Sequence, residues 1–282
     1  MRKGKISAIP LFFGICRALS PSQRGHATRS TGYSMKKILA LVLACLAFCA
    51  SPAFAQKTYI NGIDPNYPPF AYIDEKTGSP AGFDVDCLNW IANKMGFKIE
   101  HKAMAWDGII PSLLAKQIDM IGSGMSITDK RRQQVDFSEP YWQVSRVFLV
   151  AKDSKLTPEQ ILSTKGLKLG VQRGTSEAEA IRTEQKEKGY GFELRNYDSC
   201  PLAVTDLLNG RIQAALMDSL PANDAIAKGS AVKIAGTHGN PDDFGVAIRK
   251  GDTELMKLIN EGYKLIKADP IWKELQKKYL TK

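Results

Sequence analysis

The stretch Ile121-Gly-Ser-Gly-Met-Ser-Ile-Thr-Asp-Lys-Arg131 joins the end of an apolar strand to the start of a helix. Its two glycines and two serines expose backbone, Thr128 suits a helix N-cap, and Arg131 falls in the first turn beyond it. Arginine binds planar carboxylates through two parallel hydrogen bonds, so the stretch predicts a site for a small carboxylate. The same residues also fit a turn with a surface arginine.

Strand-like and helix-like segments alternate on both sides of this stretch. Strands are expected at residues 59–63, 147–151, 167–172, 192–197, 214–217, 232–235 and 244–248. Helical spacing of apolar residues ends at Gly96, and a long amphipathic helix begins at Thr253 and is broken at Asp269-Pro270. Ser176 and Glu179 have the spacing of a capping box at another helix start. This alternation predicts an α/β fold with mainly parallel sheets.

The formal net charge of +10 comes mostly from the N-terminal segments. Residues 35–55 begin with Met35-Lys36-Lys37, continue with an apolar run and end in Ala53-Phe54-Ala55, which predicts a signal peptide cleaved after Ala55. Residues 1–34 contain six basic and no acidic residues, and we interpret them as an upstream extension from a misassigned start. Without the eight basic residues of these segments, 31 basic and 29 acidic residues remain, a net charge near +2. A nucleic-acid partner is therefore not expected.

Only two of the five cysteines belong to the expected mature chain. Cys87 lies in a helical apolar pattern that predicts a core position, and the spacing of Cys87 and Cys200 leaves open whether they pair. Cys45, in Val42-Leu-Ala-Cys45, resembles a lipoprotein cleavage site, but the short apolar run before it favours cleavage after Ala55 and a soluble product.

Several motifs, in order along the chain, resemble family 3 of the extracellular solute-binding proteins, the polar amino-acid receptors of bacterial import systems. They are Asp64-x-x-Tyr67-Pro-Pro-Phe70, Gly82-Phe-Asp-Val-Asp86, Gly124-Met-Ser-Ile-Thr-Asp-x-Arg131, Phe137-Ser-x-Pro-Tyr141, Gly174-Thr175 and Gly210-Arg-x-x-Ala-Ala-x-x-Asp218. Together they span nearly all of residues 57–282. Cys87 departs from the family signature, where an aliphatic residue is usual, but cysteine packs as a small hydrophobe.

The resemblance implies a two-lobe periplasmic binding protein fold of type II, in which two crossover hinge strands join the lobes. Residues 56–148 and 244–282 would form the first lobe, and residues 149–243 the second. The hinges would lie near Val150 and Asp243. A ligand would be held between the lobes, without a cofactor or metal.

A free amino acid presents a carboxylate, an ammonium group and a side chain, and the resemblance implies partners for each. Arg131 would bind the carboxylate, with the backbone N–H groups of Gly124 and Ser126. Thr175 and Ser176, at a helix N-terminus, would bind it from the second lobe, and helix capping is an equally valid role for both.

The ammonium group would be bound by Asp218, at the end of a strand, and by Ser123. The ligand side chain would lie between Tyr67 and Trp106, because aromatic walls give a large contact area.

Asp64 would select among ligands, since a carboxylate suits a cationic or amide side chain, although it could instead bond the backbone of its own turn. Gln172 would line the pocket as a neutral polar group. These residues favour a polar or basic amino acid, such as glutamine, arginine, lysine or histidine.

The expected function is that of a monomeric periplasmic receptor, which binds a free amino acid by hinged closure and delivers it to the membrane permease of an ABC importer. The main alternative is an enzyme like the periplasmic cyclohexadienyl dehydratases, with Glu177 or Asp64 as the acid. His101 and His238 lack the spacing for metal or nucleophilic catalysis, which argues against other enzymes. A third alternative, a sensory ligand-binding domain, is disfavoured because no membrane helix follows.

Overall fold

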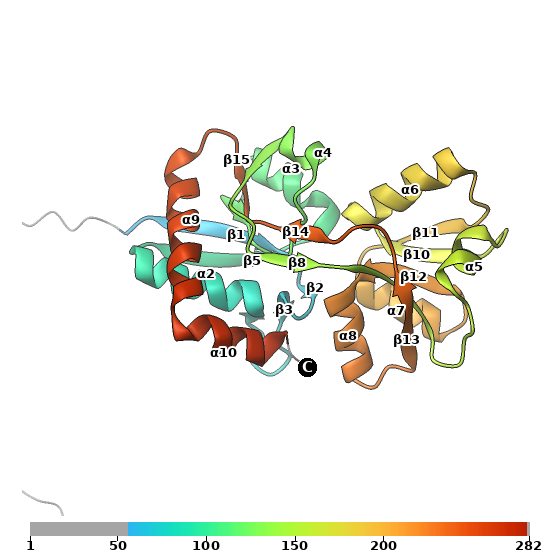
Figure 1. Ribbon diagram of the computed structural model, residues 1–282. Coiled ribbons are helices and arrows are strands. Elements are labelled where there is room, and N and C mark those ends of the chain that lie inside the picture. Colours follow the sequence, from blue (N-terminus) through green and yellow to red (C-terminus); the bar gives the residue numbers. More distant parts are fainter. Residues whose placement is uncertain (1–55, 281–282) are drawn as a thin grey trace, which may run out of the picture. The chain divides into compact units, whose positions relative to one another are not determined.

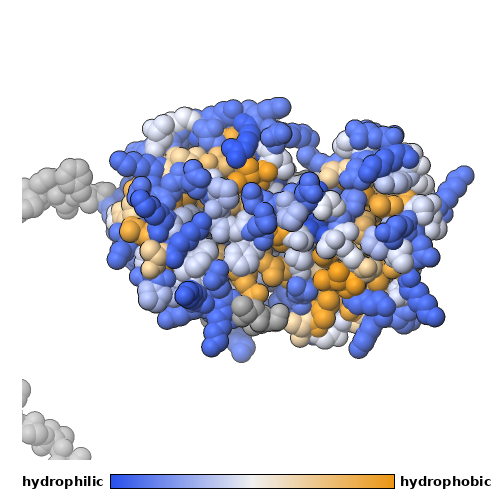
Figure 2. Space-filling model, in the orientation of Figure 1, coloured by the Kyte–Doolittle hydropathy of each residue, from blue (hydrophilic) through white to orange (hydrophobic). Residues whose placement is uncertain are grey.

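A computed structural model describes residues 56–280, and strands and helices alternate throughout this range (Figure 1). The expected signal peptide at residues 35–55, Cys45 and the extension before them lie outside the described residues. Between residues 56 and 280, no helix is long and apolar enough to cross a membrane. On the face drawn in Figure 2, hydrophilic residues cover most of the surface.

The first sheet has five strands in the order β5-β1-β6-β15-β7. Their bounds are β1 Thr58–Ile63, β5 Lys98–Ala103, β6 Met120–Ile121, β7 Val135–Phe137 and β15 Ala247–Arg249. β1 is parallel to β5 and β6, whereas β15 is antiparallel to β6 and β7. A separate small sheet follows β1 in the sequence. Its three short strands are β2 Asn66–Tyr67, β3 Ala71–Ile73 and β4 Pro80–Ala81.

The helices around the first sheet pack on its strands or on one another. They are α2 Phe83–Met95, the 3₁₀ turn η1 Trp106–Gly108, α3 Ile109–Leu114, α4 Asp129–Arg132, α9 Thr253–Ala268 and α10 Pro270–Tyr279. α2 ends where its periodicity predicts, because Gly96 follows in the left-handed conformation (φ +76°) that glycine adopts without strain. Leu88 and Ile91 of α2 are fully buried in one cluster with Ile259 and Ile266 of α9. Cys87 is buried in this cluster too, as its helical position predicts.

The second sheet also has five strands, in the order β11-β10-β12-β9-β13. Their bounds are β9 Arg146–Ala151, β10 Lys168–Gln172, β11 Glu193–Tyr197, β12 Ala214–Asp218 and β13 Val232–Thr237, and the helices among them are α5 Pro158–Ser163, α6 Ser176–Lys188, α7 Cys200–Leu208 and α8 Ser219–Ala227. β10 is parallel to β11 and β12, and β9 is antiparallel to β12 and β13. Both sheets are therefore mixed, and the expectation of mainly parallel sheets is only partly correct.

Two short strands connect the sheets (Figure 1). β8 Trp142–Val144 leads into β9, and β14 Asp242–Phe244 returns from β13 to β15. They pair antiparallel with each other, Asp243 opposite Gln143. These crossovers add antiparallel strands at the point where the chain enters and leaves each sheet, and so produce the mixed pairing.

The crossover geometry bears on two expectations. Val150, near which a hinge was expected, lies inside β9, where it is paired with Lys233 and fully buried. Since the pairing of β9 in the second sheet begins at Arg146, we propose that the first lobe ends before Arg146 rather than at residue 148. The single strand expected at residues 244–248 is wrong: β14 ends at Phe244 and β15 begins at Ala247, because the chain changes sheets between them.

Candidate functional site

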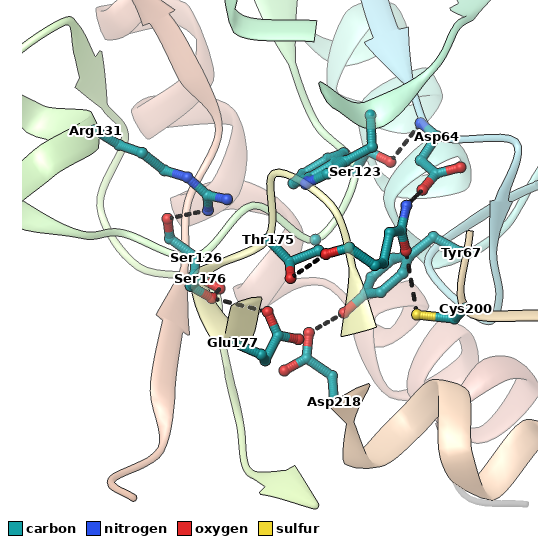
Figure 3. A pocket seen from close by; sticks show the side chains of 13 residues that line it. Asp64, Tyr67, Ser123, Ser126, Arg131, Thr175, Ser176, Glu177, Cys200 and Asp218 are labelled. Atoms are coloured by element: carbon teal, nitrogen blue, oxygen red, sulfur yellow. Dashed lines mark hydrogen bonds between the residues drawn. The ribbon is translucent and has the colours of Figure 1, made fainter. Parts of the chain in front are cut away.

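A narrow cavity lies where loops at the ends of strands from both sheets meet (Figure 3). It is lined by Asp64, Tyr67, Trp106, Ser123, Gly124, Ser126, Arg131, Gln172, Thr175, Ser176, Glu177, Cys200 and Asp218. The eleven candidate ligand-binding residues all belong to this lining, and Glu177 and Cys200 are the two additions. Residues separated by more than 150 positions therefore converge at one place, as expected at the carboxyl ends of parallel strands.

Arg131 is held in place by the local structure of α4. Thr128 caps this helix, accepting a hydrogen bond from the Arg131 N–H at 3.2 Å, as predicted. The Arg131 side chain is buried, with 6% of its surface exposed. Its Nη1 donates to the Ser126 carbonyl at 2.8 Å, and its Nη2 donates to the Gly174 carbonyl at 3.1 Å. The guanidinium thus reaches the loop between β10 of the second sheet and α6.

Trp106 and Tyr67 form aromatic walls of the cavity. The guanidinium carbon of Arg131 lies 5.6 Å from the centre of the Trp106 ring, a cation–π distance. Trp106 Nε1 donates to the Gly174 carbonyl at 3.2 Å. Both aromatic side chains are mostly buried. Each also donates a hydrogen bond to a residue of the second sheet or its loops, Trp106 to Gly174 and Tyr67 to Asp218.

Two buried polar side chains fix the loop that follows β6. Asn61 of β1 accepts from the Gly122 N–H at 2.6 Å and donates to the Gly122 carbonyl at 3.1 Å. Asp84, in the first turn of α2, accepts from the Gly124 N–H at 2.6 Å. This last contact corrects one expectation: the Gly124 N–H serves the fold, so in this structure it is not free for a ligand carboxylate.

Glycine is required at position 124 for two reasons. The residue has φ +61°, and a Cβ added there would lie 2.4 Å from Cε1 of Tyr67 and 3.1 Å from Cε2 of Phe244. The left-handed backbone and the close approach of Tyr67 both exclude a side chain without rearrangement.

Asp84 is a fully buried carboxylate without a cationic partner. One oxygen accepts from Gly124 and, at 2.7 Å, from the Tyr141 hydroxyl, while the other has no hydrogen-bond partner. Burial raises the pKa of Asp84 to about 7, and the two hydrogen bonds oppose this rise. The folded protein therefore favours the protonated form of this residue.

We expect the Asp84→Asn variant to gain stability relative to the wild type as the pH rises from about 4 to about 7. Over this range folded wild-type protein holds a proton that the unfolded chain releases, so its stability falls with rising pH, whereas asparagine does not titrate. A pKa rise from 3.8 to about 7 corresponds to on the order of 4 kcal/mol. Urea unfolding of both proteins across this range measures the difference.

The exposed Asp153 provides the matched control for this comparison. The stability difference between Asp153→Asn and the wild type should stay constant across the same pH range. An Asp84→Asn difference that is equally constant would contradict the assignment of a perturbed carboxyl group to Asp84.

The second half of the site is the N-terminus of α6. Thr175 is the N-cap, because its side chain accepts from the Ala178 N–H at 3.2 Å, and it also donates to the Gln172 carbonyl at 2.8 Å. The capping box expected for Ser176 and Glu179 is therefore wrong. The cap lies one residue earlier, at Thr175, and Ser176 is already helical. Its hydroxyl is freed from capping, and it lies 3.1 Å from the Ser126 hydroxyl.

Asp64 bridges the two halves of the site. Its carboxylate accepts from Gln172 Nε2 at 2.7 Å and from the backbone N–H of Asn66 at 2.9 Å. Its own N–H donates to the Ser123 hydroxyl at 3.0 Å, and the Cys200 thiol donates to Gln172 Oε1 at 3.2 Å. Burial raises the pKa of Asp64, and the bond from Gln172 lowers it. Both roles weighed for Asp64, a cavity-lining carboxylate and a turn-bonding one, are present together.

Asp218 and Glu177 form the acidic end of the cavity. The Tyr67 hydroxyl donates a short hydrogen bond to one oxygen of Asp218, and the other oxygen has no partner. Burial first, and then the neighbouring charge of Glu177, hold the pKa of Asp218 well above its usual range. The position of Glu177 directly after Ser176 could have predicted that it lines the cavity. No motif at the start of α7 could have predicted the same for Cys200.

A cavity lined from two mixed sheets, which two crossover strands connect, defines a two-lobe ligand-binding protein. The chain belongs to the bacterial extracellular solute-binding proteins, family 3, whose family model matches residues 59–282.

Known relatives cover most of the chain. The lysine/arginine/ornithine-binding periplasmic protein of Escherichia coli K12 is 35% identical, over 86% of this chain and 96% of that protein. The L-cystine-binding protein TcyJ of the same strain is 32% identical, over 79% of this chain and 82% of that protein. The crystal structure of an ancestral amino acid-binding protein, a precursor of cyclohexadienyl dehydratase, has a TM-score of 0.73 at 32% identity, over 79% of this chain and 96% of that chain.

Proposed function

We propose that this protein is a periplasmic receptor that binds a polar or basic L-amino acid between its two lobes and delivers it to the permease of an ABC importer. The observation that carries the proposal is the charge pattern of the cavity, with the Arg131 guanidinium at one end and the Asp218 and Asp64 carboxylates away from it (Figure 3). These groups match the carboxylate, ammonium and side chain of one amino acid. The names of the relatives support the same ligand class.

Arg131 is the proposed carboxylate-binding group. Its outer nitrogens now donate to two backbone carbonyls, and a ligand carboxylate is a stronger acceptor for the same donors. Ser126, Thr175 and Ser176 lie beside it and add hydroxyl and helix N-terminal donors from both lobes.

Asp218 and Ser123 are the proposed ammonium partners. Asp218 has one carboxylate oxygen without a hydrogen-bond partner, which leaves it able to accept from an ammonium group. The excess of buried carboxylates over the single guanidinium favours a ligand whose own net charge is positive, because an unpaired buried charge is costly.

Lobe closure is supported by the hydrogen bonds that now span the site. Arg131 to Gly174, Ser176 to Ser126, and Gln172 to Asp64 each join a group near the first sheet to a group near the second. We infer that the ligand first binds through Arg131, and that the second lobe then closes on it by bending at β8 and β14. The closed monomer is the form that the permease would recognise.

A thermal-shift screen against the twenty amino acids tests the function. A ligand that binds only the folded state raises the melting temperature, so a polar or basic amino acid should give the largest increase. A screen in which no amino acid changes the melting temperature would contradict the receptor function.

A dehydratase-like activity on the same fold is the second candidate, and the ancestral structural neighbour motivates its test. Asp64 and Glu177 both line the cavity, together with Asp218, and they are the acids that this chemistry would use. Incubation with prephenate or arogenate, followed by product analysis, distinguishes the two functions: product formation would replace the receptor proposal with an enzymatic one.

We expect Asp64→Asn to weaken binding of cationic amino acids by about tenfold and binding of glutamine much less. Asparagine keeps an acceptor for the Asn66 N–H but removes the negative charge, and hydrogen bonds to charged groups are worth roughly 1.5–3 kcal/mol. Titration calorimetry with arginine and with glutamine measures the two affinities. Equal losses for both ligands would mean that Asp64 acts only through its bonds to Gln172 and Asn66.

A further inference from the structure

Glu177 and Asp218 hold two carboxylates against each other at the acidic end of the cavity, and we propose that Glu177 is a second binding group for the ligand ammonium. In the empty site Asp218 holds a proton beside Glu177, and the bound ammonium group displaces this proton to solvent. The proposal rests on the amino-acid receptor function, because it assigns a role within that site.

The two carboxylates come from different elements. Asp218 ends β12, and Glu177 lies in the first turn of α6. They are 3% and 4% exposed, respectively. Figure 3 shows the two carboxylates pointing toward one another beside the Tyr67 hydroxyl. The Ser176 hydroxyl lies 3.1 Å from one oxygen of Glu177, and one oxygen of Asp218 has no partner at all.

Two arginines, Arg131 and Arg146, act on this pair through their charge, but their hydrogen bonds go to other groups. The outer nitrogens of Arg131 bond to the Ser126 and Gly174 carbonyls, and Arg146 forms a bidentate ion pair with Asp242. The ion pairs of the arginines among residues 56–280 all involve carboxylates other than Glu177 and Asp218.

The remaining titratable groups that face the pair do not supply a positive charge. The Tyr67 hydroxyl of β2 donates a hydrogen bond to Asp218, and burial raises the pKa of this hydroxyl well above the usual range. Burial likewise raises the pKa of the Cys200 thiol of α7 well above its usual range. Asp64 and Asp242, from the first lobe and from β14, add only negative charge.

Two neighbouring carboxylates in a buried site cannot both ionise at low cost, so Asp218 retains a proton. An ammonium group carries three donors and a positive charge, and it can bond to the unpartnered oxygen of Asp218 and to Glu177 at once. When it binds, Asp218 becomes ionised and its proton passes to the buffer. The ligand keeps its own protons, so charge and protons balance.

Titration calorimetry of the folded protein in two buffers tests this inference. The probes are L-arginine, L-lysine, L-histidine and L-glutamine, each titrated at neutral pH in phosphate and in Tris, which differ in their heat of protonation. We expect the binding heat to change between buffers by the amount that corresponds to release of about one proton for each bound amino acid. The affinity should also rise by up to roughly tenfold for each pH unit while the free site is protonated.

Matched variants on α6 separate the carboxylate pair from general effects. Glu177→Gln should reduce proton release, because the neighbouring charge is removed while the burial of Asp218 remains, and it should weaken binding by about tenfold, because one charge-assisted bond is lost. Glu187→Gln, an exposed change on the same helix, should leave both unchanged. Glu177→Gln that still releases as many protons as the wild type would overturn the inference.

The wild-type measurement separates a failure of the proton-release inference from a failure of the receptor function. Binding with an identical heat in both buffers would contradict proton release on binding, and it would leave the receptor function intact. Binding of none of the four amino acids would overturn the proposed ligand class itself, and with it the inference.

Discussion

Replacing Arg131 by alanine is expected to weaken amino-acid binding by well over tenfold. The guanidinium is buried and directed at the cavity by the capped α4 helix, so no other described side chain takes its place there. A charge-assisted hydrogen bond is worth roughly 1.5–3 kcal/mol, which corresponds to about 10- to 150-fold in affinity. Titration calorimetry with the tightest-binding amino acid of the screen measures the loss.

The neighbouring arginine provides the control for this experiment. Arg132 is exposed on the same short helix, and its guanidinium carbon lies 5.9 Å from the Phe137 ring centre rather than in the cavity. Arg132→Ala should bind with wild-type affinity. An unchanged dissociation constant for Arg131→Ala would remove Arg131 as the carboxylate-binding residue.

The second large effect is expected for Gly124→Ala. The added Cβ would lie 2.4 Å from Tyr67, whose hydroxyl bonds to Asp218, so the ring must move and the acidic end of the cavity must move with it. The left-handed backbone at φ +61° adds strain of roughly 1 kcal/mol. We expect an affinity loss of at least tenfold together with lower stability. Calorimetry and thermal unfolding measure the two effects.

Gly78→Ala separates backbone strain from the steric clash. Gly78 has a similar φ of +66°, but no atom lies within 4 Å of an added Cβ. This variant should lose a little stability and keep its affinity. If Gly124→Ala behaved in the same way, the close approach of Tyr67 would have no role in binding.

Much of the fold follows from local patterns in the sequence. α2 ends before Gly96 because apolar spacing and a left-handed glycine both act within a few residues. Arg131 lies in the cavity because Thr128 caps its helix three residues earlier. Such features depend on neighbours in sequence, and all eleven candidate residues named from the sequence and its family resemblance line the cavity.

Other features depend on contacts between distant segments, and sequence patterns did not predict them. The antiparallel strands β9 and β15 arise because β8 and β14 carry the chain between sheets. The Gly124 N–H bonds to Asp84, forty positions away, instead of remaining free. Cys200 lines the cavity only because α7 begins beside Gln172.

The sequence by itself determined the alternation of strands and helices, the end of α2 and the arginine that faces the cavity, because capping and periodicity are local, and its family resemblance implied the two-lobe fold. Only the tertiary structure decided which polar groups remain available for a ligand. It engages Asp64 with Gln172, satisfies Gly124 with Asp84, and leaves Asp218 facing Glu177 with an unpartnered oxygen. Whether a buried polar group is satisfied depends on what packs against it, and packing joins residues that are far apart in the chain.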